Sequence, residues 1–243
     1  MRSHFLSPTT HTALRRRLNR VRRLWHLRAI DTIHRAESRN PRFPELVQRI
    51  REAGTASLEY FRNGYLSEGG LRLQQNPFEF AALCTLLTER IPLPTFMEIG
   101  SASGGTCLFL SREIGFTKLL SLDDGQHPDA CYQNEHLGRI QGCIRFIGDS
   151  HSRAAHEFIS THVSAALDVA LIDGDHSAPG VWQDIQLTLK FSRPGTVIIF
   201  HDTLACEGVE HAWFKCIAEE ILEPLAEYIG AEIPLGIGVG LAR

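Results

Sequence analysis

The chain has 243 residues, of which 43% are hydrophobic and 22% are charged, and its net charge is −3. This length suits one sizeable core with an appendage, and the composition is that of an ordinary globular protein, so a wholly disordered, collagen-like or coiled-coil chain is excluded. No apolar run approaches the roughly 18 residues that a membrane-spanning helix requires, so an integral helical membrane protein is excluded too.

The first element in chain order is a basic N-terminal helical extension over residues 1–40. Residues 1–30 contain eight arginines and no acid, which leaves 17 basic and 28 acidic residues in the remainder. Such a segment suits an organellar transit peptide, peripheral contact with an anionic membrane surface or a partner, or a helix docked on the acidic body. Four apolar residues fall on one helical face: Leu14, Leu18, Val21 and Trp25.

A helical cap is expected over residues 41–92. One helix is expected over residues 44–54 and a second near residues 55–63. A third begins after Asn76, a good N-cap residue, with Glu79 three residues later at the spacing of a capping box. The main domain then covers residues 93–243.

Within the main domain, short apolar runs alternate with helical stretches. This alternation predicts an α/β fold, with a parallel sheet and helices on both faces. The final run follows a tight connection and is expected to be antiparallel to its neighbours. The expected strands cover residues 95–100, 118–124, 144–150, 167–174, 195–203 and 233–243, and the expected helices cover residues 104–114, 134–141, 151–163, 179–192 and 208–223.

Polar residues follow the expected strands, at the sheet edge where open α/β sheets bind ligands. The first strand leads into Gly100, Gly104 and Gly105, in a G-x-x-x-G-G spacing that differs from the dinucleotide-binding fingerprint. These glycines allow close approach to the backbone, and the following helix offers free N–H groups to an anion. Glu98, on the strand itself, would repel a pyrophosphate and suits a cationic or amino-bearing ligand.

Acids on the second and third strand ends complete a binding edge. Asp123 follows Gly100 by 23 residues, where an acid can bond ribose hydroxyls. Asp149 and Ser150 can reach an adenine amino group. Together these features describe a nucleoside that carries an ammonium and a carboxylate and needs no phosphate.

The motifs EIGSASGGT, LLSLDD, FIGDS, LIDGDHSAPGVWQDI and SRPGTVIIFHDT resemble class I S-adenosyl-L-methionine-dependent methyltransferases, whose fold is Rossmann-like and doubly wound with a reversed final strand. They are most similar to a branch with D-G-D-H-S and H-D-T tails, which includes cephalosporin-hydroxylase-like and macrolide-sugar O-methyltransferase-like proteins. The resemblance covers about residues 75–243. It implies that S-adenosylmethionine is bound by Glu98, Gly100, Ser101, Gly104, Asp123, Asp149, Ser150 and Asp173.

A second cluster follows the fourth and fifth strands, and its carboxylates and imidazoles can share one divalent cation. In the metal-dependent O-methyltransferases that the chain resembles, the matching ligands are Asp173 and Asp202, with His201 or His176 possible as a third, and the metal is Mg2+. A cation lowers the pKa of an acceptor hydroxyl and aligns it with the methyl group. His176 is the first candidate for the base that takes the proton, and His201 the second.

These residues predict a methyltransferase that acts on a hydroxyl group of a small molecule, such as a sugar or another specialised metabolite. The alternative is a metal-dependent hydrolase that uses Asp173, His176, His201 and Asp202. A nicotinamide oxidoreductase and a cofactor-binding regulator without catalysis are further readings, and a nucleic-acid partner is not expected because the body is acidic. The six cysteines form no C-x-x-C pair, which indicates reduced thiols and a cytoplasmic protein. A homo-oligomer is also possible on sequence grounds.

Overall fold

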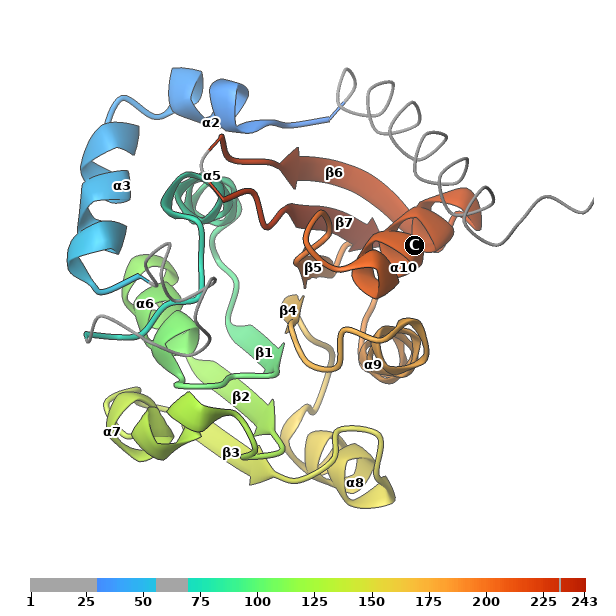
Figure 1. The fold of residues 1–243 in the computed structure, drawn as a ribbon. Helices are drawn as coiled ribbons and strands as arrows, with labels where there is room; N and C mark the ends of the chain where they lie inside the picture. Colours follow the sequence, from blue (N-terminus) through green and yellow to red (C-terminus); the bar gives the residue numbers. More distant parts are fainter. Residues whose placement is uncertain (1–29, 56–69, 232) are drawn as a thin grey trace, which may run out of the picture.

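A seven-stranded sheet forms the centre of the computed structural model, which describes residues 30–55, 70–231 and 233–243 (Figure 1). The strand order is β3-β2-β1-β4-β5-β7-β6. Strands β3, β2, β1, β4 and β5 are parallel, and β7 runs antiparallel to both of its neighbours. The expected α/β class with a reversed final strand is therefore confirmed. The strands are β1 (Thr95–Ile99), β2 (Lys118–Asp123), β3 (Cys143–Ile147), β4 (Val169–Ile172), β5 (Val197–His201), β6 (Leu222–Tyr228) and β7 (Ile237–Ala242).

The register of the parallel strands brings their ends to one level. Ile99 of β1 pairs with Leu122 of β2 and with Ile172 of β4, and Ile172 pairs with Phe200 of β5. The next residue of each strand therefore leaves the sheet at the same edge. Because neighbouring strands lie about 4.8 Å apart, the tails of β3 to β5 span roughly 19 Å along this edge.

Helices cover both faces of the sheet, as Figure 1 shows: α8, α9 and α10 lie on one side, and α5 and α6 lie on the other. This two-sided cover explains why strands such as β4 are apolar throughout and fully buried. The helices of the described residues are α2 (Ile33–Arg39), α3 (Phe43–Glu52), α5 (Pro77–Thr88), α6 (Gly105–Ile114), α7 (Gln133–Leu137), α8 (Arg153–His162), α9 (Ala178–Lys190) and α10 (Glu207–Ala218), with a 3-10 turn over Pro128–Tyr132.

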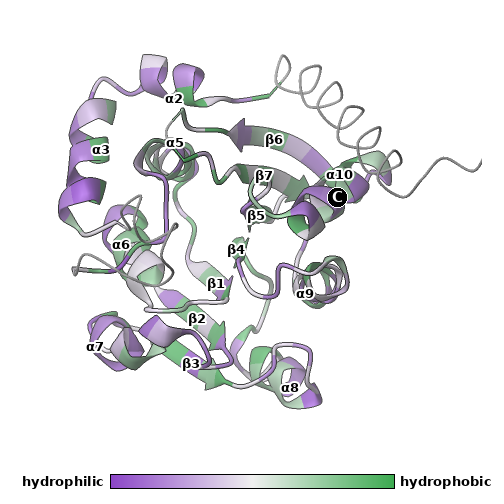
Figure 2. Ribbon diagram, viewed as in Figure 1, coloured by the Kyte–Doolittle hydropathy of each residue, from purple (hydrophilic) through white to green (hydrophobic). Residues whose placement is uncertain are grey.

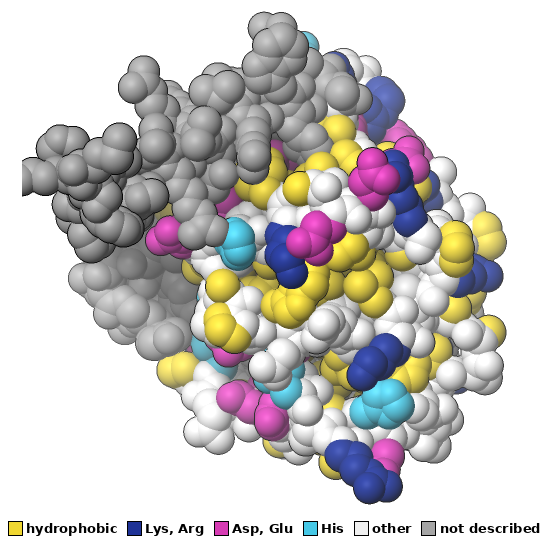
Figure 3. Space-filling view, turned by 90° about the vertical axis from the view of Figure 1, so that its right-hand side faces the viewer, with side chains coloured by type: hydrophobic (Ala, Val, Ile, Leu, Met, Phe, Trp, Pro, Cys, Tyr) yellow, Lys and Arg dark blue, Asp and Glu magenta, His cyan; other side chains and the backbone are white. Residues whose placement is uncertain are grey.

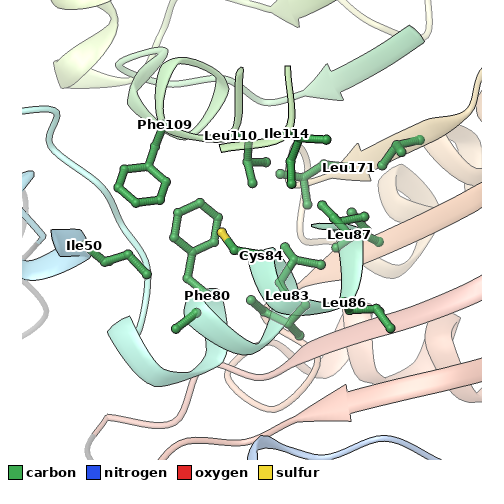
Figure 4. Close-up of a cluster of buried hydrophobic side chains, with 14 of the residues drawn as sticks. Ile50, Phe80, Leu83, Cys84, Leu86, Leu87, Phe109, Leu110, Ile114 and Leu171 are labelled. Atoms are coloured by element: carbon green, nitrogen blue, oxygen red, sulfur yellow. The ribbon is translucent and has the colours of Figure 1, made fainter. Parts of the chain in front are cut away.

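Helix α5 lies inside the main core. Almost all of its side chains are buried, and Phe80 packs toward Phe109 of α6 with ring centroids 5.4 Å apart (Figure 4). The same hydrophobic cluster continues into Leu171 of β4. A helix that is apolar all round is stable only when other elements surround it. The division into a cap over residues 41–92 and a domain over residues 93–243 stays a prediction, and α5 shares the core of the sheet.

The expected start of α5 at Asn76 is confirmed. The Asn76 side chain accepts hydrogen bonds from the backbone N–H groups of Phe78 and Glu79, at 2.9 and 3.2 Å. Glu79, however, does not close a capping box. Its two carboxylate oxygens accept from the N–H groups of Gly230 (2.7 Å) and Gly236 (2.9 Å), so this side chain ties α5 to the segment before β7.

Helix α3 matches the helix expected over residues 44–54, and hydrophobic and hydrophilic residues alternate along it in Figure 2. Its buried residues follow the i, i+3, i+4, i+7 spacing of an amphipathic helix: Phe43, Leu46, Val47 and Ile50. The helix expected near residues 55–63 and the basic stripe of residues 14–25 lie outside the described residues.

The helix expected over residues 208–223 is too long. Helix α10 ends at Ala218, and Leu222–Tyr228 forms strand β6 instead. The segment LEPLAEY lacks a clear period-two pattern, and the pairing of β6 with β7 is interrupted by a bulge between Pro224 and Ala226. Tertiary pairing, which a local pattern does not report, decides this segment. Helix α7 is also shorter than the expected residues 134–141.

Among the described residues, no helix has both the length and the apolar character needed to cross a membrane. Figure 3 shows the side of the molecule to which α8, α9 and α10 belong. On this face, basic and acidic side chains lie beside one another between scattered apolar ones, so neither sign of charge dominates it.

Candidate active site

A cleft of about 570 Å³ opens at the carboxyl ends of the parallel strands. Its position agrees with the general rule for ligand sites in open α/β sheets, at the point where the strand order reverses between β1 and β4. Two of the expected site residues, Glu98 and Gly104, do not line the cleft. Those that do are Gly100, Ser101, Asp123, Asp149, Ser150, Asp173, His176, His201 and Asp202.

Gly100 brings the tails of β1 and β4 into direct contact. Its φ of +86° is a left-handed conformation, and an added Cβ would lie 2.0 Å from the carbonyl oxygen of Asp173. A side chain at this position would therefore push the two tails apart. The glycine fixes the floor of the cleft, and the resemblance described above includes it among the residues that bind the cofactor.

The N–H groups at the start of α6 are less available than the sequence suggested. The N–H of Gly104 donates to the carbonyl oxygen of Ser101 at 2.6 Å, and the N–H of Gly105 donates to the Ser103 hydroxyl at 3.1 Å. The expectation of a free donor at Gly104 is wrong, because the tight turn satisfies its own first amides. Thr106, one residue further, lines the cleft.

Asp123 is anchored by two backbone amides. Its Oδ2 accepts from the N–H of Ala102 at 2.8 Å, and its Oδ1 accepts from the N–H of Gly125 at 2.7 Å. Each carboxylate oxygen has a second lone pair, so the side chain can accept further bonds from a ligand. Asp123 is therefore a pre-oriented acceptor at the edge of the cleft.

Glu98 lies below the cleft and is only 1% exposed. Its Oε2 is 2.6 Å from the Cys107 thiol, which donates to it. Burial raises the pKa of Glu98 to about 8, and the nearby carboxylate of Asp173 adds to this effect. At neutral pH the carboxyl group is thus mostly protonated, unless a cation approaches it.

The tail of β3 forms the other end of the cleft. Asp149 is exposed and its Oδ1 accepts from the N–H of His151, whereas the Ser150 hydroxyl donates to Oδ1 of Asp184 at 2.8 Å. His151 Nε2 lies 3.1 Å from the same Asp184 oxygen. Burial raises the pKa of Asp184 to about 6. Ser150 is therefore held by α9, which the sequence did not reveal.

The tails of β4 and β5 converge as predicted. His201 Nδ1 lies 3.1 Å from Asp173 Oδ1 and 3.3 Å from Asp202 Oδ1. His176 Nε2 lies 3.4 Å from Asp173 Oδ1 and 3.6 Å from Asp202 Oδ2. The four side chains expected to act as metal ligands and as base thus form one cluster beside the floor of the cleft.

The charges of this cluster are strongly coupled. Hydrogen bonding to Asp173, with a further contribution from Cys206, raises the pKa of His176 to about 10. Burial alone would raise the pKa of Asp173, but the two histidines outweigh it and lower this pKa to about 2. The side chain of His176 is 38% exposed and that of His201 only 3%, so His176 is the histidine that a ligand reaches more easily.

Cys206 is a member of the cluster that sequence reasoning missed. It precedes α10, and its Sγ lies 3.4 Å from His176 Nδ1 and 3.9 Å from Asp202 Oδ2. The four-residue spacing from Asp202 was the available signal, because one turn of chain can bring such residues to one side.

The segment before α5 forms a wall of the cleft, of which the sequence indicated only Gln75, from its place before this helix. Arg72, Gln74 and Gln75 line the cleft, and the Ser103 hydroxyl donates to the carbonyl oxygen of Leu71 at 2.9 Å. The Arg72 guanidinium stacks over Tyr132, 3.8 Å from the ring centroid. These contacts link residues about 30 to 60 positions apart, which no local motif indicates.

Comparison with known proteins gives a match over the part of the chain that supplies most of the cleft. Residues 97–203 match the family model of a methyltransferase domain. No curated protein matches the sequence.

Several solved structures share the fold. An O-methyltransferase described as putative, from Klebsiella pneumoniae, is 23% identical, with a TM-score of 0.55 over 82% of this chain and 90% of that one. An O-methyltransferase from Bacillus cereus in complex with SAH is 16% identical, with a TM-score of 0.55 over 84% of this chain and 91% of that one. The O-methyltransferase TomG from Streptomyces achromogenes, involved in tomaymycin synthesis and in complex with SAM, is 17% identical, with a TM-score of 0.55 over 84% of this chain and 90% of that one. The chain therefore matches a methyltransferase-domain model over residues 97–203 and shares its fold with solved O-methyltransferases.

Proposed function

We propose that this protein transfers the methyl group of S-adenosylmethionine to a hydroxyl group of a small molecule, such as a sugar or another specialised metabolite. The observation that carries the proposal is the order of groups along one cleft. Acceptors for a nucleoside lie over β3 and β2, the glycine floor lies over β1, and the carboxylate–imidazole cluster lies over β4 and β5.

In this arrangement, Asp149 and Ser150 contact the adenine, Asp123 bonds the ribose hydroxyls, and Gly100 and Ser101 accommodate the methionine part. Glu98 lies beneath that part, and a ligand ammonium nearby would lower the pKa of its carboxyl group and recover its charge. The methyl group then faces the β4–β5 side of the cleft, where Asp173 is the first side chain beyond the floor.

The reaction requires an aligned nucleophile and a proton acceptor. The acceptor oxygen attacks the methyl carbon, the carbon–sulfur bond breaks, and its electron pair stays on sulfur in S-adenosylhomocysteine. The hydroxyl proton passes to a base, for which His176 is the first candidate and His201 the second. Because the pKa of His176 is raised to about 10, this imidazole has to release its own proton before it can accept that of the hydroxyl group. The carboxylates of Asp173 and Asp202 orient the acceptor, since fixed geometry supplies much of the rate in a bimolecular transfer.

The resemblance to metal-dependent O-methyltransferases implies Mg2+ at Asp173, His201 and Asp202. The carboxylates fit this ion, which prefers oxygen ligands in an octahedral arrangement. The imidazoles and the nearby thiol do not, because nitrogen and sulfur donors favour other metals. No step of the proposed reaction is therefore assigned to Mg2+.

Neither the family match nor the structural neighbours support the alternative of a metal-dependent hydrolase. A hydrolase would also have no use for the glycine floor and the Asp123 acceptor, which lie in the same cleft as the cluster.

Calorimetry with S-adenosylmethionine and S-adenosylhomocysteine tests the cofactor half of the proposal. We expect dissociation constants below roughly 1 mM, the upper end of ordinary substrate affinities. Methyl transfer from labelled cofactor to a panel of sugars, phenols and amines tests the acceptor half. Absence of cofactor binding at millimolar concentration, or transfer to amines but not to hydroxyl compounds, would contradict the proposal.

A further inference from the structure

The side chains His176, Asp202 and Cys206 form a group of possible metal ligands in addition to Asp173, His201 and Asp202. In each group of three, the donor atoms lie within 4.8 Å of one another, and Asp202 belongs to both. Around the carboxylate of Asp202, the described residues thus offer two imidazoles, a thiol and one further carboxylate.

The spacing within the first group suits a small ion. Ligands of a tetrahedral ion with bonds of 2.0–2.3 Å lie about 3.3–3.8 Å apart. The Asp202 Oδ2 atom lies 3.6 Å from His176 Nε2 and 3.9 Å from Cys206 Sγ, and the Sγ atom lies 3.4 Å from the other ring nitrogen of His176, Nδ1. Because one ring nitrogen binds the ion, the imidazole has to turn so that the same nitrogen faces both Asp202 and Cys206.

Two further features of the cluster indicate an ionic ligand. Asp202 Oδ1 is buried and accepts no hydrogen bond from the described residues, and its charged neighbour is His201 Nδ1 at 3.3 Å, which also lies 3.1 Å from Asp173 Oδ1. Two carboxylates this close together repel each other unless positive charge lies near both, and a bound cation supplies such charge. The backbone of Asp202 has a φ of +62°, an uncommon conformation for a residue other than glycine, and such conformations concentrate at functional sites.

The chemistry of the donors selects the kind of metal. Mg2+ requires oxygen ligands and binds imidazole and thiolate poorly, whereas zinc-class ions bind all three donor types well. We propose that His176, Asp202 and Cys206 bind a divalent zinc-class ion, such as Zn2+ or Co2+, in preference to Mg2+. Asp173 and His201 lie close enough to complete the site.

The proposed metal site lies in the same cleft as the proposed methyl transfer. The metal site itself does not depend on the proposed function; only its effect on catalysis does. In the metal-loaded protein His176 is a ligand, so it is no longer available to accept the hydroxyl proton. Metal binding can be measured without any acceptor or methyl transfer, so the two proposals can fail separately.

The test uses the full chain after removal of metal with a chelator. In calorimetry we expect Zn2+ to bind one ion per chain with a micromolar or lower dissociation constant, and Mg2+ to bind at least a hundredfold more weakly. Titration with Co2+ is expected to produce the near-ultraviolet absorption band of a sulfur–cobalt bond.

Three variants locate the site. Cys206→Ser is expected to abolish the sulfur–cobalt band, and both Cys206→Ser and His176→Ala are expected to weaken Zn2+ binding at least tenfold. Cys131→Ser removes an exposed thiol away from the cluster and is expected to leave both signals unchanged. Circular dichroism checks that each variant is folded.

Some outcomes would overturn the metal assignment even if cofactor binding is normal. These are Mg2+ affinity equal to that for Zn2+, a wild-type Co2+ complex without the band, or a band that persists in Cys206→Ser. The opposite result, tight Zn2+ binding at His176 and Cys206 without any S-adenosylmethionine binding, would support the metal site and contradict the proposed function.

Discussion

Backbone contacts fix the positions of Asp123 and Gly100 in the cleft. Asp123 is held by the N–H groups of Ala102 and Gly125, and Gly100 holds the tail of β1 against that of β4. Both residues are therefore pre-oriented before a ligand arrives, which reduces the ordering cost of binding.

Asp123→Asn is expected to weaken S-adenosylmethionine binding about tenfold or more, measured by calorimetry. The amide has one acceptor oxygen in place of two, so one of the two anchoring N–H groups, or the ribose, loses its partner. Asp168→Asn is the matched control, because Asp168 is also a buried acid that accepts from a backbone N–H, that of Thr95 at 2.9 Å, but it lies at the opposite edge of the sheet. Equal loss of cofactor affinity in both variants would count against a ribose contact.

Gly100→Ala is expected to abolish cofactor binding and to destabilise the protein by about 2–4 kcal/mol, measured by denaturant unfolding. The left-handed backbone costs about 1 kcal/mol for alanine, and the clash with the Asp173 carbonyl adds an overpacking cost. Gly195→Ala shares the conformational cost, with a φ of +91°, but its Cβ would meet nothing within 4 Å. We expect Gly195→Ala to be destabilised only by the cost of the left-handed backbone, about 1 kcal/mol, and to bind the cofactor normally.

At the scale of elements, the hydrophobic periodicity of the sequence was sufficient for most of the sheet. Strands β1, β2, β4 and β5 are short apolar runs that are almost wholly buried, and the edge strand β3 is partly exposed. The positions of all five parallel strands could be predicted to within about three residues. Strand β6 could not, because its exposed Glu223 and its Pro224 remove the local pattern and only its pairing with β7 makes it a strand. The same reason explains the missed contact between α9 and Ser150, which a single sequence does not encode locally.

The candidate site divides in the same way. The strand tails were predictable, because parallel strands deliver consecutive residues to one edge. Apart from Gln75, the wall formed by residues 72–75 was not predictable, since its position depends on the packing of α5 against the sheet. Cys206 was partly predictable, because its four-residue spacing from Asp202 was the one local signal that could have indicated it.

Strand β6 is also joined to the first described residues of the chain. The Tyr228 hydroxyl donates to Asp31 at 2.9 Å, and Arg39 of α2 contacts both oxygens of the same carboxylate at 2.7 Å. Asp31 pairs with Ala226 as an isolated parallel bridge. This network fixes α2 beside the outer strand of the sheet.

Tyr228→Phe is expected to lower the free energy of unfolding at pH 7 by about 1–2 kcal/mol, because it removes a hydrogen bond to a charged group. Burial by itself raises the pKa of Asp31, but hydrogen bonds from Arg39 and Tyr228 outweigh it and lower that pKa below 3.8. The contribution is therefore complete above the ordinary pKa of an aspartate and is lost as the pH falls through the lowered value. Urea unfolding at pH 7 and pH 3 measures this difference. Tyr132→Phe is the control, since the Tyr132 ring packs under Arg72 and not beside Asp31. If Tyr228→Phe lowered the free energy of unfolding equally at both pH values, the expected role of Asp31 would be contradicted.

For the molecule as a whole, Glu79 joins segments that are about 150 residues apart. It lies on α5, is fully buried, and accepts from the N–H groups of Gly230 and Gly236 in the segment that leads into β7. Leu235 of that segment lines the cleft. The carboxyl group therefore connects the central core to the rim of the site.

Glu79 is expected to make the protein less stable as the pH rises. Burial raises its pKa to about 7 from an ordinary value of 4.5, so the folded state holds a proton that the unfolded state releases between these values. The contribution to stability is complete below pH 4.5 and is lost as the pH rises through 7, by roughly 3 kcal/mol at most. Glu79→Gln cannot titrate, so its unfolding free energy is expected to change less between pH 5 and pH 8 than that of the wild type.

Glu98 and Asp184 also have raised pKa values, so they too make the free energy of unfolding fall as the pH rises. The informative quantity is therefore the difference between the two unfolding curves, not the wild-type slope alone. Parallel curves for Glu79→Gln and the wild type would mean that Glu79 is already charged in the folded protein.

The place of β7 in the sheet has a consequence for the order of assembly during synthesis. Strand β7 lies between β5 and β6, yet it follows both of them in the chain. A nascent polypeptide that has reached residue 230 therefore contains β5 and β6 but lacks the strand that lies between them. The edge of β5 that pairs with β7 stays unpaired until Ile237–Ala242 has been made. Unpaired strand edges invite wrong partners. Slow translation of the codons for residues 231–242 is thus expected to lengthen the period in which this chain is vulnerable to aggregation.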